Sequence, residues 1–170
     1  MKPPSEQEER PGGTSRPHTG GAGPPAADVL RFELAPELVA PSIARDRFDR
    51  WLIALRWPDA QRDDLVLALS EAVSNSIEHG YGIRADAPGL GVGEVAVTAH
   101  VLVEADGLRR IVLVVRDSGV WREPVVPARF RGHGLSIIRA CADRLSIDGT
   151  DDGTTLTLTT RTAPAPLDAA

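Results

Sequence analysis

Lysine is almost absent from this chain of 170 residues. Lys2 is the only lysine, although the chain carries 19 basic residues. A P-loop needs a lysine in its Gly-Lys-Ser/Thr motif to contact nucleotide phosphates, and protein kinases of the common type need one on a strand. The sequence therefore excludes both kinds of phosphate site. Any nucleotide bound by this chain must be held by other chemistry.

Cysteine, long apolar runs and excess positive charge are also scarce. The single Cys141 cannot form an internal disulfide, which fits a reducing cytosol, and we expect a small buried residue there rather than a nucleophile. No apolar run reaches membrane-spanning length, and the first residues lack the apolar core of a signal peptide. The net charge is -5 with no basic patch. We therefore expect a cytoplasmic protein without membrane or direct nucleic-acid partners.

The composition divides the chain into a folded domain with two loose ends. Residues 1–27 are crowded with proline, glycine and charge and contain almost nothing to bury. Such composition predicts a disordered tail. Residues 163–170 are predicted to be a loose C-terminal end. The domain of residues 28–162 is long enough to bury one core.

Hydrophobic periodicity predicts alternating blocks of strands and helices. The predicted strands cover residues 30–34, 94–104, 109–116, 145–148 and 154–160, and the predicted helices cover residues 43–55, 59–79 and 134–143. Asp59 is the expected N-cap of the second helix. The short turns between the later strands imply antiparallel pairing. We expect an α+β fold, a two-layer sandwich with helices on one face of a mixed, mostly antiparallel sheet.

The second predicted helix carries polar side chains in steps of four residues. Glu71, Asn75 and His79 share nearly one face, among apolar neighbours. A solvated stripe is one interpretation. Asn, however, has poor helix propensity, so a polar contact is the other. Asn offers a neutral oxygen to Mg²⁺, which prefers few protein ligands together with phosphates and waters. A Glu one turn earlier could accept a proton beside that metal.

Two later motifs combine glycine with polar side chains. Asp117-Ser118-Gly119 follows the apolar run IVLVV, where a carboxylate could accept a hydrogen bond from a nucleobase amine. Taken alone, the motif is typical of a turn. Gly132-His133-Gly134-Leu135 precedes a predicted helix, and free N–H groups at a helix start bind phosphate. The preceding loop holds arginines that could contact phosphate or lie in solvent: Arg122, Arg129 and Arg131.

Two further glycine-containing stretches are ambiguous or unsuitable. Thr154 and Thr155 follow Gly153 and could reach a nucleotide, although threonine is common in strands for packing reasons. The stretch GLGVG, residues 89–93, precedes a strand and does not open a helix. We therefore reject it as a phosphate loop.

The order of these motifs is more specific than any one of them. Glu-x-x-x-Asn on a helix, Asp-x-Gly after a strand, Gly-x-Gly-Leu at a helix start and Gly-Thr before the last strand resemble the GHKL ATPases of the Bergerat fold. The segments LALSEAVSNSIEHGYG, VVRDSGVW and RGHGLSIIRACADRLSI are similar to bacterial anti-sigma-factor serine kinases and standalone histidine-kinase-like ATPase domains. The resemblance covers roughly residues 29–160, nearly the whole predicted domain.

The resemblance implies a role for each motif. Glu71 would be the general base and Asn75 the Mg²⁺ ligand, with His79 in the same ATP site. Asp117 would bind the adenine amine beside Gly119. The phosphates would lie against Arg131, Gly132, His133, Gly134 and Leu135, and Thr154 or Thr155 would sit near the adenine. Arg45 and Arg47 on the first helix would face a protein partner.

The implied function is an ATP- and Mg²⁺-dependent serine kinase. Its substrate would be a small STAS-type anti-sigma-factor antagonist, and a sigma factor and a second copy of the chain are further implied partners. One departure favours an alternative, a non-catalytic ATP-binding regulatory module that acts by protein binding. The family's Asp-x-Gly-x-Gly ends here in Trp121 instead of glycine, and the lid of residues 120–131 is short and contains Pro124 and Pro127.

Overall fold

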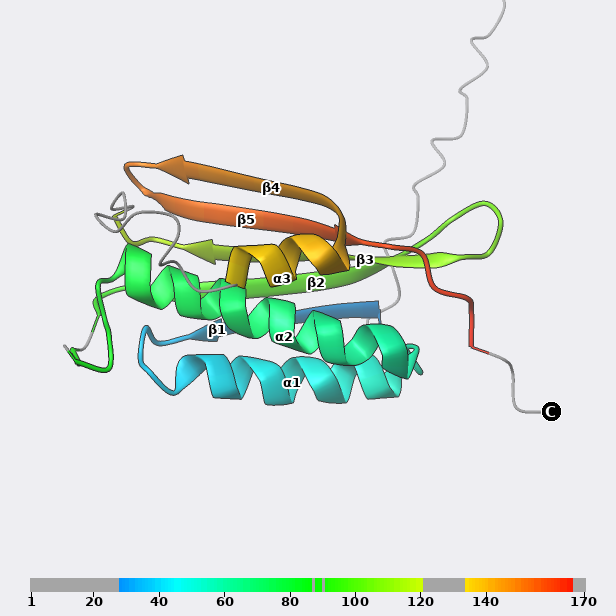
Figure 1. Ribbon diagram of the computed structural model, residues 1–170, viewed down its shortest axis with the longest axis horizontal. Helices are drawn as coiled ribbons and strands as arrows, with labels where there is room; N and C mark the ends of the chain where they lie inside the picture. Colours follow the sequence, from blue (N-terminus) through cyan, green and yellow to red (C-terminus); the bar gives the residue numbers. More distant parts are fainter. Residues whose placement is uncertain (1–27, 87, 90, 121–133, 167–170) are drawn as a thin grey trace, which may run out of the picture.

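The computed structural model describes residues 28–86, 88–89, 91–120 and 134–166, which form a sheet covered by helices on one face (Figure 1). The five-stranded sheet has the order β1-β2-β3-β5-β4, and every pairing in the described part is antiparallel. The strands are β1 (Val29–Leu34), β2 (Val95–Val103), β3 (Arg109–Asp117), β4 (Ala142–Thr150) and β5 (Gly153–Thr160). The expected α+β sandwich is confirmed.

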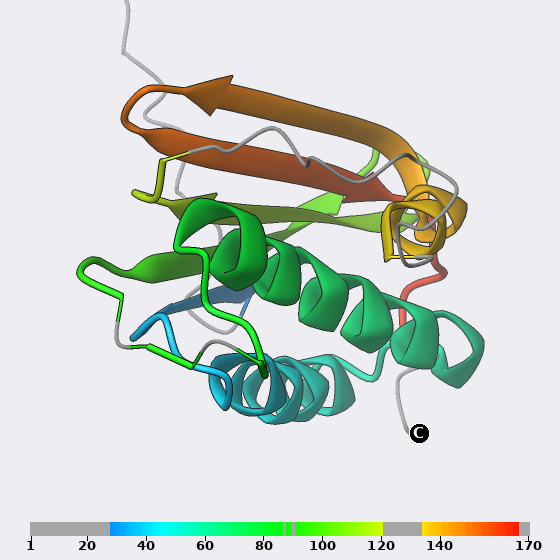
Figure 2. The same ribbon diagram turned by 60° about the vertical axis from the view of Figure 1, so that its left-hand side comes forward.

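Three helices lie side by side on the sheet. They are α1 (Ala40–Ala54), α2 (Asp59–Asn75) and α3 (Gly134–Cys141), and α2 contacts both of the others. The opposite face of the sheet is not covered by any helix of the described residues (Figure 2). Among those residues, no helix is both long and apolar enough to cross a membrane.

The core lies between the sheet and the helices. Alternate residues of the three central strands face the helices and are buried: Val95, Val97, Ala99 and Val101 of β2, Ile111, Leu113 and Val115 of β3, and Leu156 and Leu158 of β5. Phe48, Leu52, Leu65 and Leu69 meet them from α1 and α2. Each valine, leucine, isoleucine or phenylalanine among them contributes about 1.5–3 kcal/mol of burial free energy. The same alternation makes Asp117, two residues after Val115, face the helix layer.

The junction between α1 and α2 differs from the expected capping. The Trp57 N–H donates to the Leu52 carbonyl and the Arg56 N–H to the Ile53 carbonyl, each at 2.9 Å. Arg56 has a φ of 49°, so this is a Schellman motif with arginine at the left-handed position. Asp59 is not the N-cap, because Pro58 occupies that position. The Asp59 carboxylate accepts a bond from Arg62 instead, at 2.6 Å.

The α-helical part of α2 ends earlier than expected. The sequence predicts a continuous helix to His79, but the chain widens into a π turn, η2 (Ser76–Gly80), directly after Asn75. Short π segments inside helices are frequently found at functional sites. Here the π turn places Gly80 beside the end of β3, where Gly80 lies close to Asp117. β4 is also longer than predicted, and α3 is two residues shorter.

Candidate nucleotide site

Asp117 is the centre of the candidate site. It is only 2% exposed and lies at the end of β3, directly opposite Thr154 at the start of β5. Its Oδ1 atom accepts N–H bonds from Gly119, at 3.1 Å, and from Thr154, at 3.2 Å. These bonds orient the carboxylate. Within the described residues its Oδ2 atom accepts no hydrogen bond, so one oxygen remains able to bind a ligand donor.

Backbone from two other segments packs closely around this carboxylate. A side chain at Gly119 would place its Cβ 2.4 Å from the Gly80 carbonyl carbon, so η2 and the Asp117 turn touch through backbone alone. Gly153 has a φ of 132°, and a Cβ there would lie 1.9 Å from the Asp117 carbonyl oxygen. Both positions therefore require glycine. No sequence pattern pointed to Gly80 as part of the site, and Gly153 stood out only as the residue before the two threonines.

Thr154 supplies a buried hydroxyl without a partner. The residue is 7% exposed, and its Oγ1 atom makes no hydrogen bond in the described part of the chain. A buried polar atom left unpaired is costly, so it indicates a missing water or ligand. This hydroxyl faces the same side of the sheet as Asp117. The edge of an adenine presents an amine donor next to an acceptor. These two groups fit the Asp117 carboxylate and the Thr154 hydroxyl.

Thr155 does not join this group. It pairs with Arg116, which is exposed, so the alternation of the strand directs Thr155 to the uncovered face of the sheet. The sequence alone left the two threonines as alternatives. The structure favours Thr154 as the one beside Asp117.

The predicted helical wall of the candidate site consists of Glu71, Asn75 and His79. All three are half-buried, the first two on α2 and His79 on the π turn. Among the described residues, no three His, Cys, Asp or Glu side chains gather into a group that could hold a metal. An ion at Asn75 would need nucleotide phosphates and waters to complete its ligands, which is the environment that Mg²⁺ prefers.

Only part of the predicted phosphate loop lies within the described residues. Gly134 begins α3 and Leu135 follows it in the helix. The arginines of the loop, together with Trp121, Gly132 and His133, lie outside the described residues: Arg122, Arg129 and Arg131. The described residues therefore include the surroundings of Asp117 and the predicted helical wall, but not this loop.

Cys141 lies away from these residues. The single proton of its thiol has two possible acceptors, the Ile137 carbonyl at 3.1 Å and the Asp64 carbonyl at 3.4 Å, beside a cavity of about 130 Å³. Burial, and then the charge of Asp64, raise the pKa of the Cys141 thiol. A raised pKa disfavours the nucleophilic thiolate. Cys141 is only half-buried, which differs from the expected burial, but it packs against the core as expected.

Known proteins share both the sequence pattern and the fold of this chain. Residues 32–160 match the model of the histidine kinase-like ATPase domain. This chain belongs to that family. The motifs of the GHKL ATPases and the antiparallel sandwich of the Bergerat fold are thus found in one domain, and ATP is the nucleotide that the family implies.

Two solved structures are similar to this ATPase domain. The crystal structure of the RsbU and RsbW domains of Rv1364c from Mycobacterium tuberculosis is 26% identical, with a TM-score of 0.53, over 82% of this chain and 34% of that chain. This domain thus spans about a third of that protein. The histidine kinase domain of the blue-light activated histidine kinase EL346 from Erythrobacter litoralis is 14% identical, with a TM-score of 0.42, over 69% of this chain and 60% of that chain.

Proposed function

We propose that this ATPase domain is an anti-sigma-factor-type serine kinase that acts on a small STAS-type antagonist protein. One observation carries the proposal: within the described residues, Oδ2 of buried Asp117 accepts no hydrogen bond and the Thr154 hydroxyl beside it has no partner. The similarity to a protein with an RsbW domain supports the partner class. A sigma factor and a second copy of the chain are further partners in this proposal.

The residues of the adenine side have separable roles. Asp117 Oδ2 accepts the N–H of the adenine amino group, and Gly119 lets the backbone approach the ring. The adenine gives the Thr154 hydroxyl the hydrogen-bond partner that this hydroxyl lacks among the described residues. The remaining binding contacts are with the phosphates. We propose that these contacts are made by His79, Arg131, Gly132, His133, Gly134 and Leu135.

The helical wall carries the phosphoryl transfer. Asn75 would hold Mg²⁺, which would neutralise charge on the phosphates when bound. Glu71 accepts the proton of the substrate serine hydroxyl as that oxygen forms its bond to the γ-phosphorus. The bond from the γ-phosphorus to the bridging oxygen breaks, and ADP leaves with that electron pair. Positioning and charge neutralisation supply most of the catalysis in such a reaction.

Substitution Glu71→Gln tests the kinase function. The amide keeps the size of the side chain but cannot accept the proton, so we expect ATP affinity within about threefold of wild type and transfer slowed about 100-fold or more. Calorimetry measures ATP binding in the presence of Mg²⁺. Radiolabel from γ-labelled ATP, recovered as phosphoserine on candidate antagonists, measures transfer.

The same experiment distinguishes the alternative function. ATP binding by the wild type without label on any antagonist would favour a non-catalytic regulatory module, which the replacement of a motif glycine by Trp121 also favours. Unchanged transfer by Glu71→Gln would remove Glu71 as the base. The absence of saturable ATP binding to the wild type would overturn both functions.

A further inference from the structure

The Tyr81 hydroxyl joins three segments beside the candidate site. It donates to the Glu94 carbonyl at 2.7 Å and accepts the Ser118 N–H at 3.2 Å. Its third contact is with the Ser118 hydroxyl, at 3.1 Å. Tyr81 directly follows η2, Glu94 directly precedes β2, and Ser118 directly follows β3. One hydroxyl therefore holds the ends of three elements together.

The bonding capacity of this hydroxyl is fully used. A phenolic oxygen offers one proton and two lone pairs. The proton goes to the Glu94 carbonyl, because a carbonyl can only accept. Both lone pairs then face Ser118, one receiving its N–H and the other its hydroxyl proton. A side chain that only packed at the surface would not need all three bonds, so this arrangement indicates a fixed position for the turn after β3.

Gly91 and Gly93, from the stretch that the sequence pattern did not favour as a phosphate loop, leave space for Tyr81. A Cβ at Gly93 would lie 2.9 Å from the Tyr81 hydroxyl and 2.7 Å from Ser118 Oγ. A Cβ at Gly91 would lie 3.1 Å from the Tyr81 ring and 2.6 Å from Pro36. These glycines leave the space in which the tyrosine and its serine partner meet. The stretch thus acquires a structural purpose next to the candidate site.

We propose that Tyr81 is a positioning residue for recognition of the adenine amino group. Ser118 is the residue between Asp117 and Gly119, and the Gly119 N–H orients the Asp117 carboxylate. By fixing Ser118, the Tyr81 hydroxyl fixes the turn that aims Asp117 Oδ2 at the base. Tyr81 acts through Asp117 and does not itself touch the nucleotide. This inference rests on the proposed ATP binding.

Substitution Tyr81→Phe tests this role, because it removes the hydroxyl and keeps the ring. The ligands are ATP and purine riboside triphosphate, which lacks only the amino group. One hydrogen bond to a charged group corresponds to about 10–100-fold in affinity, so the wild type should prefer ATP by that factor. In Tyr81→Phe we expect the preference to fall to about threefold or less, chiefly through weaker ATP binding.

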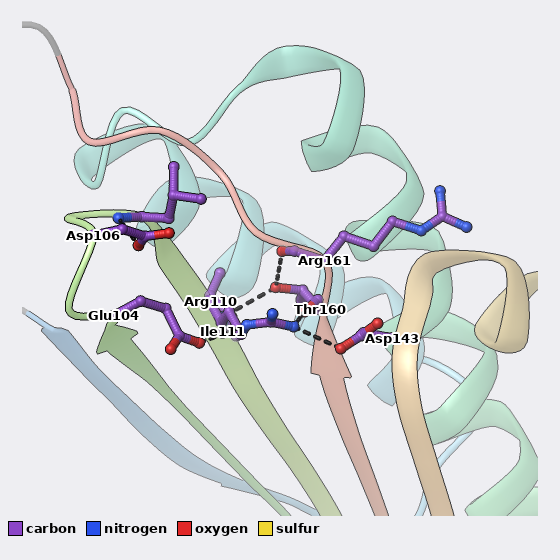
Figure 3. A network of polar contacts seen from close by, with 8 residues as sticks. Glu104, Asp106, Arg110, Ile111, Asp143, Thr160 and Arg161 are labelled. Atoms are coloured by element: carbon purple, nitrogen blue, oxygen red, sulfur yellow. Dashed lines mark hydrogen bonds and ion pairs between the residues drawn. The ribbon is translucent and has the colours of Figure 1, made fainter.

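Thr160→Val is the matched control. The Thr160 hydroxyl also accepts a backbone N–H, from Ile111 at 3.0 Å, and donates to a carbonyl, that of Arg161 at 2.8 Å (Figure 3). It lies at the other end of the β3–β5 pair from Asp117. This variant also loses a bridging hydroxyl. If Tyr81 had a merely structural role, Tyr81→Phe and Thr160→Val would have the same effect on the preference for ATP over purine riboside triphosphate. We expect instead that Thr160→Val keeps the full preference.

Amide hydrogen exchange provides a readout that does not depend on nucleotide. In Tyr81→Phe the Ser118 amide should exchange about tenfold faster or more, while amides in the middle of β3 stay protected. If this variant does not fold, Ser118→Ala replaces it, because it removes the hydroxyl that donates to the Tyr81 oxygen. An unchanged ATP preference or an unchanged exchange rate of the amide at position 118 in the folded variant would overturn the inference. Wild-type protein that binds neither nucleotide would instead overturn the proposed function.

Discussion

At the scale of single residues, one oxygen of the Asp117 carboxylate is bonded within the fold, and the other is the one that we propose binds the base. Oδ1 is occupied by the N–H groups of Gly119 and Thr154. In Asp117→Asn these donors still require an oxygen, so they orient the amide with its NH₂ group in place of Oδ2. That group would meet the adenine amine donor to donor. We expect ATP affinity to fall about 10–100-fold or more, measured by calorimetry, with little change in thermal stability.

The control for this residue is Asp143→Asn. Asp143 is an exposed acid whose carboxylate accepts a bond from Arg110 at 2.6 Å, away from the candidate site (Figure 3). The same chemical change there should leave ATP binding as in the wild type. Wild-type affinity in Asp117→Asn would show that Oδ2 does not bind the base.

At the scale of elements, the end of α1 carries conformational strain that can be removed. Arg56 occupies the left-handed position of the Schellman motif, which glycine adopts at lower cost. We expect Arg56→Gly to raise the free energy of unfolding by about 0.5–1 kcal/mol. Urea denaturation measures the change. Arg56→Ala keeps a Cβ at the strained φ and should not raise the free energy of unfolding in this way. Equal stabilisation by both variants would show that the loss of the arginine side chain, and not the relief of strain, is the cause.

The elements also show what sequence patterns can and cannot predict. The strand before Asp117 was predictable, because an apolar run that ends in a carboxylate and a glycine marks a strand end. The choice between Thr154 and Thr155 needed the β3–β5 register, which no local pattern specifies. The role of Tyr81 depends on bonds to residues 13 and 37 positions further along the chain. Contacts of that kind arise only from the tertiary fold.

At the scale of the whole molecule, the candidate site and the C-terminal segment lie at opposite ends of β3. Arg109 begins the strand and Asp117 ends it, roughly 25 Å apart at the usual rise per residue. The backbone of Arg109 exchanges two hydrogen bonds of 2.8 Å with Ala163, which is fully buried. The hydrogen-bonded structure therefore continues past residue 162, where the sequence suggested a loose end.

The Arg109 side chain holds this second end of the molecule together. Its guanidinium lies 4.9 Å from the centre of the Trp57 ring and donates to the Leu55 carbonyl at 3.0 Å and to the Pro164 carbonyl at 3.1 and 3.2 Å. Burial lowers the pKa of this guanidinium, although arginine stays protonated in proteins. One buried cation thus joins the end of α1 to the C-terminal segment.

Substitution Arg109→Met should separate stability from nucleotide binding. Methionine fills part of the space but leaves the Leu55 and Pro164 carbonyls without a donor, so we expect a loss of about 2–4 kcal/mol in thermal or urea denaturation. ATP affinity should stay within about twofold, because distant sites contribute independently. Arg110→Met removes the neighbouring, more exposed arginine with its Glu104 and Asp143 pairs, and should destabilise the fold much less than Arg109→Met, because exposed ion pairs contribute little. Equal losses in the two variants, or weakened ATP binding in Arg109→Met, would contradict this division of the molecule into a binding end and a stabilising end.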